Sequence, residues 1–389
     1  MKELLIRSQG GKPAAALTDG GKLVAYFPLS PQPFISPEAL FLGKAGRVLK
    51  NLEAMFVSLP GGTAGFLPFG EMPGGQRPGG GDSLIVQVKK PPQGKKAAFL
   101  TMDIALPGRL AVLLPESKVA HASTRLEGVE KSALTRTAAR LKPEGMGLVL
   151  RAAALNAEEK DILADIKVLQ NTWQDIRQKA QTGPAPALLL PAPDPLARLL
   201  REEREAPSRI LSDDLRAAQS LGIHVESSPD PFALYNIPHQ LRQALKRRVY
   251  LPSGGTLVID PCEAGTVIDV NTGRNSVRGQ DIILKTNLEA AREAARIIRL
   301  RGVGGIVLID FIDMKTEGHR ERVLAAFEEA VKDDPVKTVA HGFTQLGILE
   351  ATRKKAMPAL QAQTLTPCSV CGGSGYKGFS EEETDVNHA

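Results

Sequence analysis

The chain has 389 residues, enough for two or three domains, and 42% of them are hydrophobic, which excludes a wholly disordered protein. Its formal charge of +6 favours an anionic partner, of which nucleic acid is the commonest. The N-terminal segment lacks the apolar core of a secretory signal, and no apolar run approaches the roughly 20 residues that span a bilayer. Three cysteines are too few for a disulfide framework. We therefore expect a cytoplasmic protein with reduced thiols and no membrane span.

The chain opens with strand patterns. Residues 2–8 and 14–27 alternate as strands do, and Asp19-Gly20-Gly21 is a tight-turn signal between two of the runs. The proline-rich stretch at 30–37 then breaks the pattern, as expected at a domain junction.

Residues 41–114 form short strand-like runs separated by glycine and proline, a spacing that predicts a small antiparallel barrel. Phe56 and Phe66 fall in two of these runs. Lysines lie nearby at positions 89, 90, 95 and 96. Aromatic rings among cations are typical of proteins that bind single-stranded nucleic acid, because every base offers a face for stacking. The alternative is that both phenylalanines belong to the core of the barrel.

Helical patterns dominate the next part of the chain. Residues 127–179 are mainly helical, with a strand at 145–154, and the proline-rich segment 181–195 indicates a crossing between subdomains. Further helical patterns follow at 196–207 and 212–222. A basic helix is expected from residue 241, carrying Arg242, Lys246, Arg247 and Arg248 on what is most simply a solvated face.

From residue 255 the pattern changes to strand, helix, strand. Runs at 256–260 and 265–271 read as strands, and residues 286–302 as an amphipathic helix that Thr286 or Asn287 would cap. A strand follows at 304–314, and another helix at 320–334. The strand–helix–strand order predicts neighbouring parallel strands.

Two of these strands carry acids in an apolar setting. Asp269 and Asn271 share one face because the side-chain period of a strand is two. If the strands are neighbours in register, Asp269 and Asp310 converge near their carboxyl ends, where α/β sheets place ligands. Paired carboxylates repel unless a cation lies between them, and Mg²⁺ binds one or two carboxylates together with water and substrate phosphate. The alternative is that these are structural acids at strand ends.

Cys368-Ser-Val-Cys371 is followed by glycines, as in a zinc knuckle. Structural Zn²⁺ needs four ligands, so a second copy of the chain would supply the other two. A redox-active pair is the alternative. Cys262 stands apart and reads as a small buried residue.

Taken together, these stretches resemble the ribonuclease E/G family. The matching text includes EAMFVSLPGGTAGFLPF, LPSGGTLVID, TVIDVNTGR, TNLEAAREAARIIRLRGVGGIVLIDFIDM, GILEATRKK and CSVCGGSG, in that order, and covers nearly the whole chain. The resemblance implies a multi-subdomain α/β fold. Its parts would be a ribonuclease-H-like scaffold at 1–36 and 183–245, an inserted OB-type barrel at 37–102, a 5′-sensor at 103–182, a deoxyribonuclease-I-like catalytic subdomain at 246–362, a zinc-link at 363–376 and a flexible acidic tail at 377–389.

The family's functional residues carry over position by position. Asp269 and Asp310 would hold Mg²⁺ and Asn271 would orient the scissile phosphate. Phe56 and Phe66 would stack on RNA bases, and Lys96 would contact the RNA backbone. Arg151 would bind a 5′-monophosphate. The resemblance assigns Cys368 and Cys371 to a Zn²⁺ shared between the subunits of a homodimer.

Some positions depart from the family pattern. Ala152 follows Arg151 where the family has threonine, which removes a hydroxyl donor to the 5′-phosphate, and Gln345 replaces a cation. The sequence ends soon after the cysteine pair, so we expect a dimer without the long scaffold arm of the larger members.

The expected function is a Mg²⁺-dependent endoribonuclease that acts on single-stranded RNA in rRNA maturation or mRNA turnover and leaves 5′-phosphate products. Two alternatives remain. One is an RNA-binding protein with weak or no cleavage. The other is a Mg²⁺-dependent phosphodiesterase acting on small nucleotides.

Overall fold

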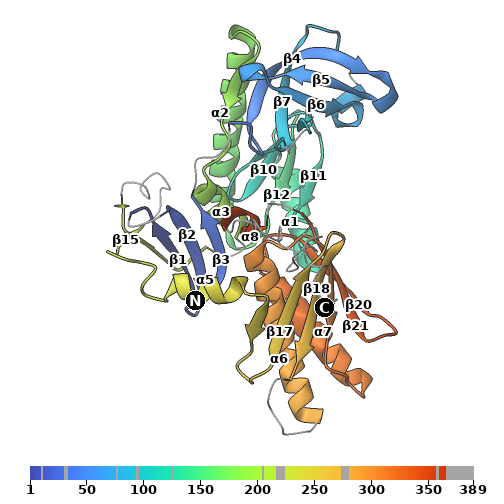
Figure 1. Cartoon of the computed structure of the whole chain (residues 1–389). Helices are drawn as coiled ribbons and strands as arrows, with labels where there is room; N and C mark the ends of the chain where they lie inside the picture. Colours follow the sequence, from blue (N-terminus) through green and yellow to red (C-terminus); the bar gives the residue numbers. More distant parts are fainter. Residues whose placement is uncertain are drawn as a thin grey trace, which may run out of the picture. The chain divides into compact units, whose positions relative to one another are not determined.

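The computed structural model describes the chain at residues 1–9, 12–29, 34–75, 78–92, 96–124, 126–203, 206–215, 224–272, 280–355 and 359–364. The fold divides into two compact units, each built from distant stretches of the sequence (Figure 1). The first unit comprises Met1–Pro28, Arg209–Ala217 and His224–Ala389, and the second comprises Leu29–Ser208 and Ala218–Ile223.

A five-stranded sheet of the first unit joins the start of the chain to a segment far along it. Its order is β15-β14-β1-β2-β3, with β1 at Lys2–Arg7, β2 at Ala14–Asp19, β3 at Lys22–Pro28, β14 at Arg209–Ser212 and β15 at Glu226–Ser227. β2 and β3 form the predicted hairpin, and its turn contains Gly20 and Gly21 at φ +54° and +78°, where glycine is favoured. β1 pairs with β14 in parallel, which ties residues 2–7 to the middle of the chain.

The second sheet of this unit carries the acidic strands. Its order is β16-β17-β18-β19-β21-β20, with β16 at Arg248–Tyr250, β17 at Thr256–Pro261, β18 at Gly265–Asn271, β19 at Gly305–Asp310, β20 at Thr338–Phe343 and β21 at Ile348–Arg353. Helix α6, at Gln280–Arg301, connects β18 to its parallel neighbour β19, which confirms the predicted strand–helix–strand unit. The other described strand pairs of this sheet are antiparallel.

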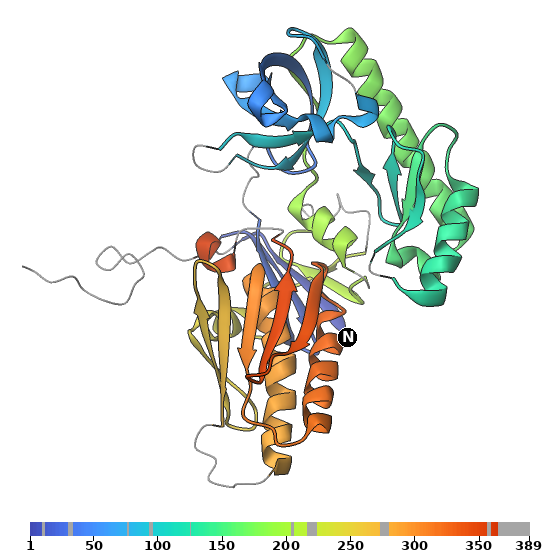
Figure 2. The same cartoon turned by 90° about the vertical axis from the view of Figure 1, so that its right-hand side faces the viewer.

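Helices cover one face of this sheet. Figure 2 shows α6 and α7, at Glu317–Val331, side by side along it. Ile268 and Val270 of β18 are buried in a core shared with the alanines of α6. The intervening residues of β18, namely Val267, Asp269 and Asn271, are exposed on the opposite side, which we call the open face. The period of two thus separates a packed face from one that offers polar groups to a ligand.

Helix α6 begins earlier than the sequence pattern predicts. The expected cap at Thr286 or Asn287 is wrong, because the helix begins at Gln280 and both residues are buried within it. Leu284 is also buried in the core, so the apolar stripe begins before the predicted start of the helix at residue 286. The predicted end is confirmed: Gly302 follows the helix with φ +65°, a conformation suited to glycine.

The second unit contains a closed five-stranded barrel. Its strands are β4 at Leu40–Leu49, β5 at Ala54–Ser58, β6 at Ala64–Pro68, β7 at Ser83–Lys90 and β8 at Ala98–Thr101. The barrel closes because β7 pairs with both β8 and β4. β8 lies between β6 and β7 and runs parallel to β6. The prediction of an antiparallel barrel is therefore wrong for this one strand pair. β13, at Ala187–Leu190, pairs with β4, so this piece of the 183–245 region extends the barrel sheet and does not join β1.

A smaller sheet completes the second unit. Its order is β11-β12-β10-β9, with β9 at Leu106–Pro107, β10 at Ala111–Leu114, β11 at Ala120–Ala122 and β12 at Gly147–Leu150. Two helices, α1 at Gly128–Leu141 and α2 at Glu159–Thr182, pack their apolar residues against it, including Leu134 and Trp173. The predicted helical region interrupted by a strand is therefore confirmed.

The remaining elements are short. They are helices α3 at Pro195–Glu202, α5 at Ile237–Leu245 and α8 at Leu360–Thr364, and 3-10 helices η1 at Lys50–Leu52, η2 at Pro60–Gly62, η3 at Phe69–Glu71, η4 at Pro73–Gly75 and η5 at Ala152–Asn156. The predicted basic helix is largely wrong: α5 contains Arg242 but ends at Leu245, so Lys246 and Arg247 follow it and Arg248 begins β16. Most of the predicted helix at 212–222 lies outside the described residues, as does the acidic tail at 377–389.

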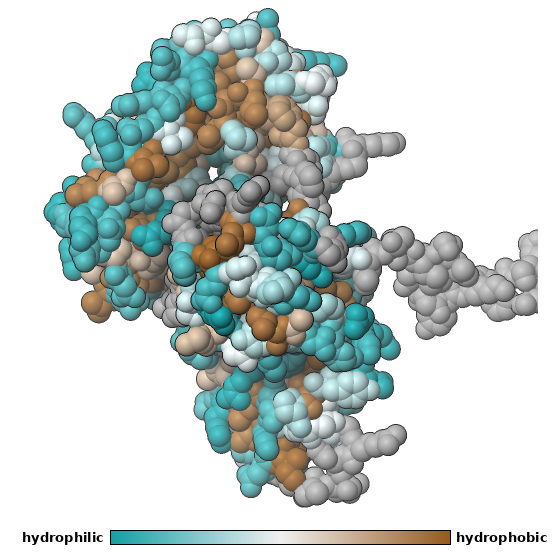
Figure 3. Space-filling model, turned by 90° about the vertical axis from the view of Figure 1, so that its left-hand side faces the viewer, coloured by the Kyte–Doolittle hydropathy of each residue, from teal (hydrophilic) through white to brown (hydrophobic). Residues whose placement is uncertain are grey.

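The molecular surface mixes residue types. On the face shown in Figure 3, hydrophobic residues lie in patches among hydrophilic ones, which is usual for a folded domain. Within the described part of the chain, no helix combines the length and the apolar character that crossing a membrane requires.

Candidate active site

Asp269 and Asp310 lie directly opposite each other on neighbouring strands. The parallel register of β18 and β19 pairs these two residues at the carboxyl end of both strands. Neighbouring strands are about 4.8 Å apart, and paired residues of parallel strands point to the same side. Both side chains are exposed on the open face. The structure therefore brings the two predicted acids together at the edge of the sheet where α/β folds bind ligands.

The two carboxylates influence each other electrostatically. Partial burial and then the negative charges of Asp269 and Asp313 raise the pKa of Asp310 above its ordinary value. Asp313 lies past the end of β19, three residues after Asp310. On the other side of the pair, the Asn271 side-chain amide donates a hydrogen bond of 2.7 Å to Oδ2 of Asp269. The carboxylates of Asp269, Asp310 and Asp313 repel one another, and the Asn271 amide offsets this only at Asp269. A cation bound between the carboxylates would therefore stabilise the site.

The donor set fits Mg²⁺. It consists of two carboxylates with an amide beside them, all oxygen or hydrogen-bonding groups, and Mg²⁺ is usually held by one or two carboxylates while water and substrate phosphate fill the other positions. Within the described ranges, no cluster of three or more His, Cys, Asp or Glu side chains forms a complete metal cage. The acid pair therefore suits an ion that is shared with a phosphate ligand.

Asn287 supports the site from behind the sheet, and sequence reasoning assigned it only a capping role. Its side chain is fully buried (0% exposed). Its amide donates to the carbonyl oxygen of Ile312 at 2.8 Å, and its own oxygen accepts from the Ile312 backbone N–H at 3.2 Å. Ile312 lies between Asp310 and Asp313, so this clamp holds the segment that carries both acids. The sequence did contain a signal for this role: Asn287 is a polar residue on the apolar stripe of α6, one turn before Ala291, and a buried polar side chain needs a hydrogen-bond partner.

Three phenylalanines form a row on the barrel. Phe56 pairs with Phe66 across β5 and β6, and Phe66 pairs with Phe99 on β8. The ring centroids are 6.1 Å and 6.2 Å apart, and all three side chains are half-buried. The alternative that Phe56 and Phe66 fill the barrel core is wrong, because the core consists of their neighbours such as Met55 and Leu67. Phe99 was missed, although it alternates with buried residues in the same way.

Lysines flank this row. Lys90 Nζ lies 5.7 Å from the centroid of the Phe99 ring, within the range of a cation–π contact. Lys96 is exposed just before β8. Lys89 differs because it forms an ion pair of 2.7 Å with Glu71. Of the lysines noted in the sequence, Lys95 lies outside the described residues.

Arg151 is half-buried at the start of η5 and takes part in an internal network. Its guanidinium donates to the backbone carbonyl oxygen of Arg201 at 2.9 Å. Nη2 of Arg201 in turn donates to both carboxylate oxygens of Glu38, at 2.8 and 2.7 Å. The predicted phosphate-binding arginine therefore already contacts the protein, and η5 begins at Ala152, the position that departs from the family pattern.

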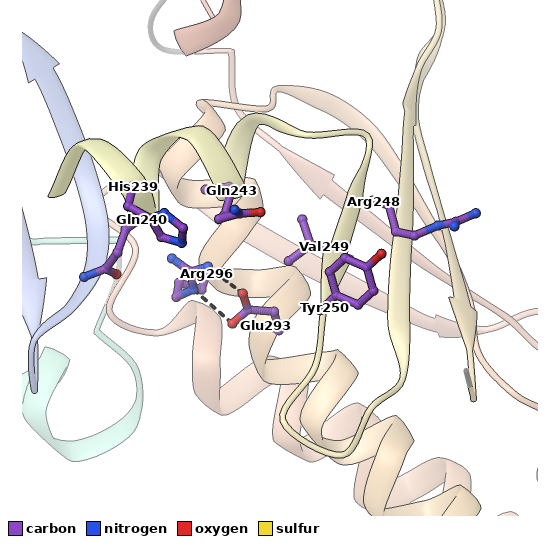
Figure 4. Close-up of a pocket in the computed structure, with 9 residues that line it drawn as sticks. His239, Gln240, Gln243, Arg248, Val249, Tyr250, Glu293 and Arg296 are labelled. Carbon is purple, nitrogen blue, oxygen red and sulfur yellow. Dashed lines mark hydrogen bonds and ion pairs between the residues drawn. The ribbon is translucent and has the colours of Figure 1, made fainter. Parts of the chain in front are cut away.

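Cys262 and one cavity of the first unit lie apart from the acid pair. Cys368 and Cys371 are outside the described residues, while Cys262 is exposed and not buried as expected, because it follows the end of β17. A cavity of about 320 Å³ occurs in the first unit (Figure 4). Residues of α5, β16 and α6 line it, including a bidentate ion pair between Glu293 and Arg296. Neither Asp269 nor Asp310 lines this cavity.

Comparisons with known proteins identify the family. The ribonuclease E/G family profile matches residues 105–356. Ribonuclease E of Haemophilus influenzae is 34% identical, over 96% of this chain and 44% of its own length, and ribonuclease E of Nostoc sp. is 38% identical over 78% and 47%. Ribonuclease G of Salmonella typhimurium is 33% identical over 86% of this chain and 76% of its own length. The chain spans about half the length of the ribonuclease E relatives it matches. With its mixed α/β architecture and closed barrel, the chain belongs to the ribonuclease E/G family.

Proposed function

We propose that this chain is a Mg²⁺-dependent endoribonuclease that hydrolyses phosphodiester bonds of single-stranded RNA and leaves 5′-phosphate products. Its role would be RNA processing or turnover, including rRNA maturation. The observation that carries the proposal is the register that pairs Asp269 with Asp310 on the open face. The names of the relatives, ribonuclease E and ribonuclease G, support the reaction class.

The chain's own residues would divide the work. Asp269 and Asp310 would hold Mg²⁺, which when bound supplies Lewis acidity toward a phosphoryl oxygen and lowers the pKa of a coordinated water. Asn271 already donates one N–H to Asp269, and its amide has a second N–H to offer a phosphate oxygen. Asn287 would keep Asp310 in place through the Ile312 backbone. In this arrangement the phosphate is oriented and its developing charge is countered at the same edge of the sheet.

The barrel would hold the RNA strand. Phe56, Phe66 and Phe99 offer a row of ring faces for successive bases, and Lys96 would contact the RNA backbone. Such a row suits a polymer better than a mononucleotide, which speaks against a small-nucleotide phosphodiesterase. We assign the barrel to the OB type, the first sheet to a ribonuclease-H-like scaffold, and the acid-bearing sheet to a deoxyribonuclease-I-like catalytic subdomain.

Two further sites extend the proposal. The smaller sheet with α1 and α2 would form the 5′-sensor, in which Arg151 binds a 5′-monophosphate in exchange for its contact with Arg201. Cys368 and Cys371 would share Zn²⁺ with the same residues of a second chain and so join a homodimer.

The test is cleavage of a 5′-monophosphorylated, AU-rich single-stranded oligonucleotide by Asp269→Asn and Asp310→Asn variants. We expect each change to slow cleavage by about 100-fold or more, the scale on which removal of one group that stabilises the transition state acts. Asp260→Asn is the matched control, since Asp260 lies on β17, its side chain pairs with Arg247, and it is not opposite Asp310. Unchanged cleavage in both acid variants would refute the mechanism.

The second candidate, an RNA-binding protein with weak or no cleavage, is favoured by the internal contacts of Arg151 and by Gln345. It predicts identical RNA footprints with and without Mg²⁺ and no new 5′ ends. Efficient, Mg²⁺-dependent cleavage of the oligonucleotide by the unaltered protein would exclude it.

A further inference from the structure

The open face continues from the acid pair to an exposed basic and aromatic edge. Across the sheet, Arg248 of β16 pairs with Val258 of β17, Val258 pairs with Asp269, and Asp269 pairs with Asp310. These four residues thus form one row on the same side of the sheet. Arg248 is at the end of this row, two strand spacings from Asp269, which is roughly 10 Å between backbones.

Arg248 is available to a ligand. Its side chain is exposed, and among the described residues it has no ion-pair partner. Its neighbour Arg247 differs, because the Arg247 guanidinium donates to Asp260 at 2.7 Å and neutralises that carboxylate. In Figure 4 the Arg248 side chain extends away from the Glu293–Arg296 ion pair that lines the cavity. Neither Asp260 nor Glu293 therefore neutralises the positive charge of Arg248.

Tyr250 stands beside Arg248 on the same strand. It is 67% exposed, a large value for an aromatic side chain. Through Thr256 it belongs to the next row of the sheet, which ends at Asn271. Arg248 and Tyr250 are two residues apart on a strand, so their side chains project from the same side. A cation and an exposed ring side by side match the backbone and the base of one nucleotide.

Resting on the proposed function, we propose that Arg248 and Tyr250 form a subsite for the RNA strand on one side of the scissile bond. The guanidinium binds a phosphate adjacent to the one at the acid pair, and the Tyr250 ring stacks on the neighbouring base. A flexible arginine side chain bridges much of the two-strand spacing, so the same strand of RNA reaches both places. The row of paired residues sets the direction of the RNA across the sheet, from Asp310 toward β16.

The experiment separates binding from cleavage. RNA binding is measured in the Asp310→Asn background, which keeps the substrate intact, for Arg248→Ala, Tyr250→Ala and Tyr250→Phe. We expect Tyr250→Ala to weaken binding roughly 5- to 100-fold, the range for loss of one stacked base, and Tyr250→Phe to restore it. Arg248→Ala should weaken binding and lower the slope of log K against log salt by about 0.7, the value for one phosphate of a single strand.

The matched control is Arg292→Ala. Arg292 is an exposed arginine of α6, on the helix-covered side of the sheet, and its loss should leave both the affinity and the salt slope unchanged. Shortening the RNA from the 5′ or the 3′ end locates the contact, because the effect of Arg248→Ala should vanish for the truncation that removes the bound nucleotide. Circular dichroism of each variant verifies folding.

Two results would overturn the subsite. The first is that both Arg248→Ala and Tyr250→Ala bind RNA with wild-type affinity and wild-type salt slope. The second is that Arg248→Ala weakens binding of every truncated RNA as much as it weakens binding of the full-length RNA. These results are distinct from failure of the proposed function, which is full cleavage by the Asp310→Asn variant in an otherwise unaltered chain.

Discussion

Asn287 of α6 holds Ile312 by both polar groups of its backbone, at 2.8 Å for the carbonyl oxygen and 3.2 Å for the N–H. Ile312 lies two residues after Asp310, the last residue of β19. The helix behind the sheet thereby fixes the position of an acid on the open face. A residue on the packed side of the sheet thus positions a candidate metal ligand on the open face.

Replacement of Asn287 tests that link. Asn287→Leu leaves two partly buried backbone groups of Ile312 without these partners, so we expect the free energy of unfolding to fall by about 1–3 kcal/mol. The metal dependence should change as well, with a higher Mg²⁺ concentration for half-maximal cleavage, because Asp310 loses its support. Lys285→Ala, an exposed change on the same helix, is the control for both measurements. A variant that loses stability but keeps the wild-type Mg²⁺ response would show that Asn287 does not position the acid.

The raised pKa of Asp310 predicts a pH-dependent stability. Because the folded-state pKa lies above the unfolded value, ionisation of Asp310 destabilises the folded state as pH rises through that range. In EDTA at pH 7, Asp310→Asn should therefore be more stable than wild type, by about 0.2–1 kcal/mol for a directly opposed like-charge pair. Below the ordinary carboxyl pKa of about 4, Asp310 becomes protonated in the folded and in the unfolded chain, and the difference should shrink toward zero. Urea unfolding at pH 7 and pH 3.5 measures it, and an equal difference at both pH values would contradict the assignment.

Mg²⁺ should stabilise the folded chain through the acid pair. Binding to the folded state alone adds about 2.7 kcal/mol when the free ion is at 100 times its Kd. We expect the thermal unfolding midpoint of the wild type to rise with Mg²⁺, that of Asp269→Asn to rise much less, and that of Asp260→Asn to follow the wild type. Scanning calorimetry with and without Mg²⁺ provides the comparison, independently of any cleavage. Matching shifts in wild type and Asp269→Asn would place the ion elsewhere.

Phe99 should contribute to RNA binding as one of the three rings of the row. Phe99→Ala removes the ring that would stack on a base and that Lys90 contacts. We expect the free energy of RNA binding to become less favourable by roughly 1–3 kcal/mol. Phe34→Ala is the matched control, since Phe34 is 53% exposed in the same unit but packs against Phe41 outside the row. Fluorescence anisotropy with a short single-stranded RNA measures both variants. Equal losses in the two would mean that the row has no special role.

The cysteine pair leads to a prediction about assembly. Changing Cys368 and Cys371 together to serine should remove bound Zn²⁺ and shift the mass toward the monomer, because each chain would supply two of four ligands. Metal analysis and light scattering report the two effects separately. Cys262→Ser is the control, as this exposed cysteine is remote in sequence from the pair. A dimer that persists without zinc would show that another surface joins the subunits.

Local patterns in the sequence predict most of the helices and strands and the pairing of the two acids. The period of two placed Asp269 and Asn271 on one face, and the strand–helix–strand order made β18 and β19 parallel neighbours. Glycine and proline spacing predicted the barrel. These features depend on residues close together in the chain, where side-chain periodicity and turn chemistry act directly.

Most contacts between distant segments do not follow from these local patterns. The resemblance implied that residues 1–36 join residues 183–245, and β1 pairs with β14 of that region. The pairings of β13 with β4 and of β16 with β17 came from the structure alone, and the second of these aligns Arg248 with Asp269. Asn287 contacts Ile312 because a helix and a strand end pack together, and Phe99 joins its row because β8 inserts beside β6. Such contacts depend on how whole elements bury their apolar faces, and local sequence patterns carry no record of the chosen partner.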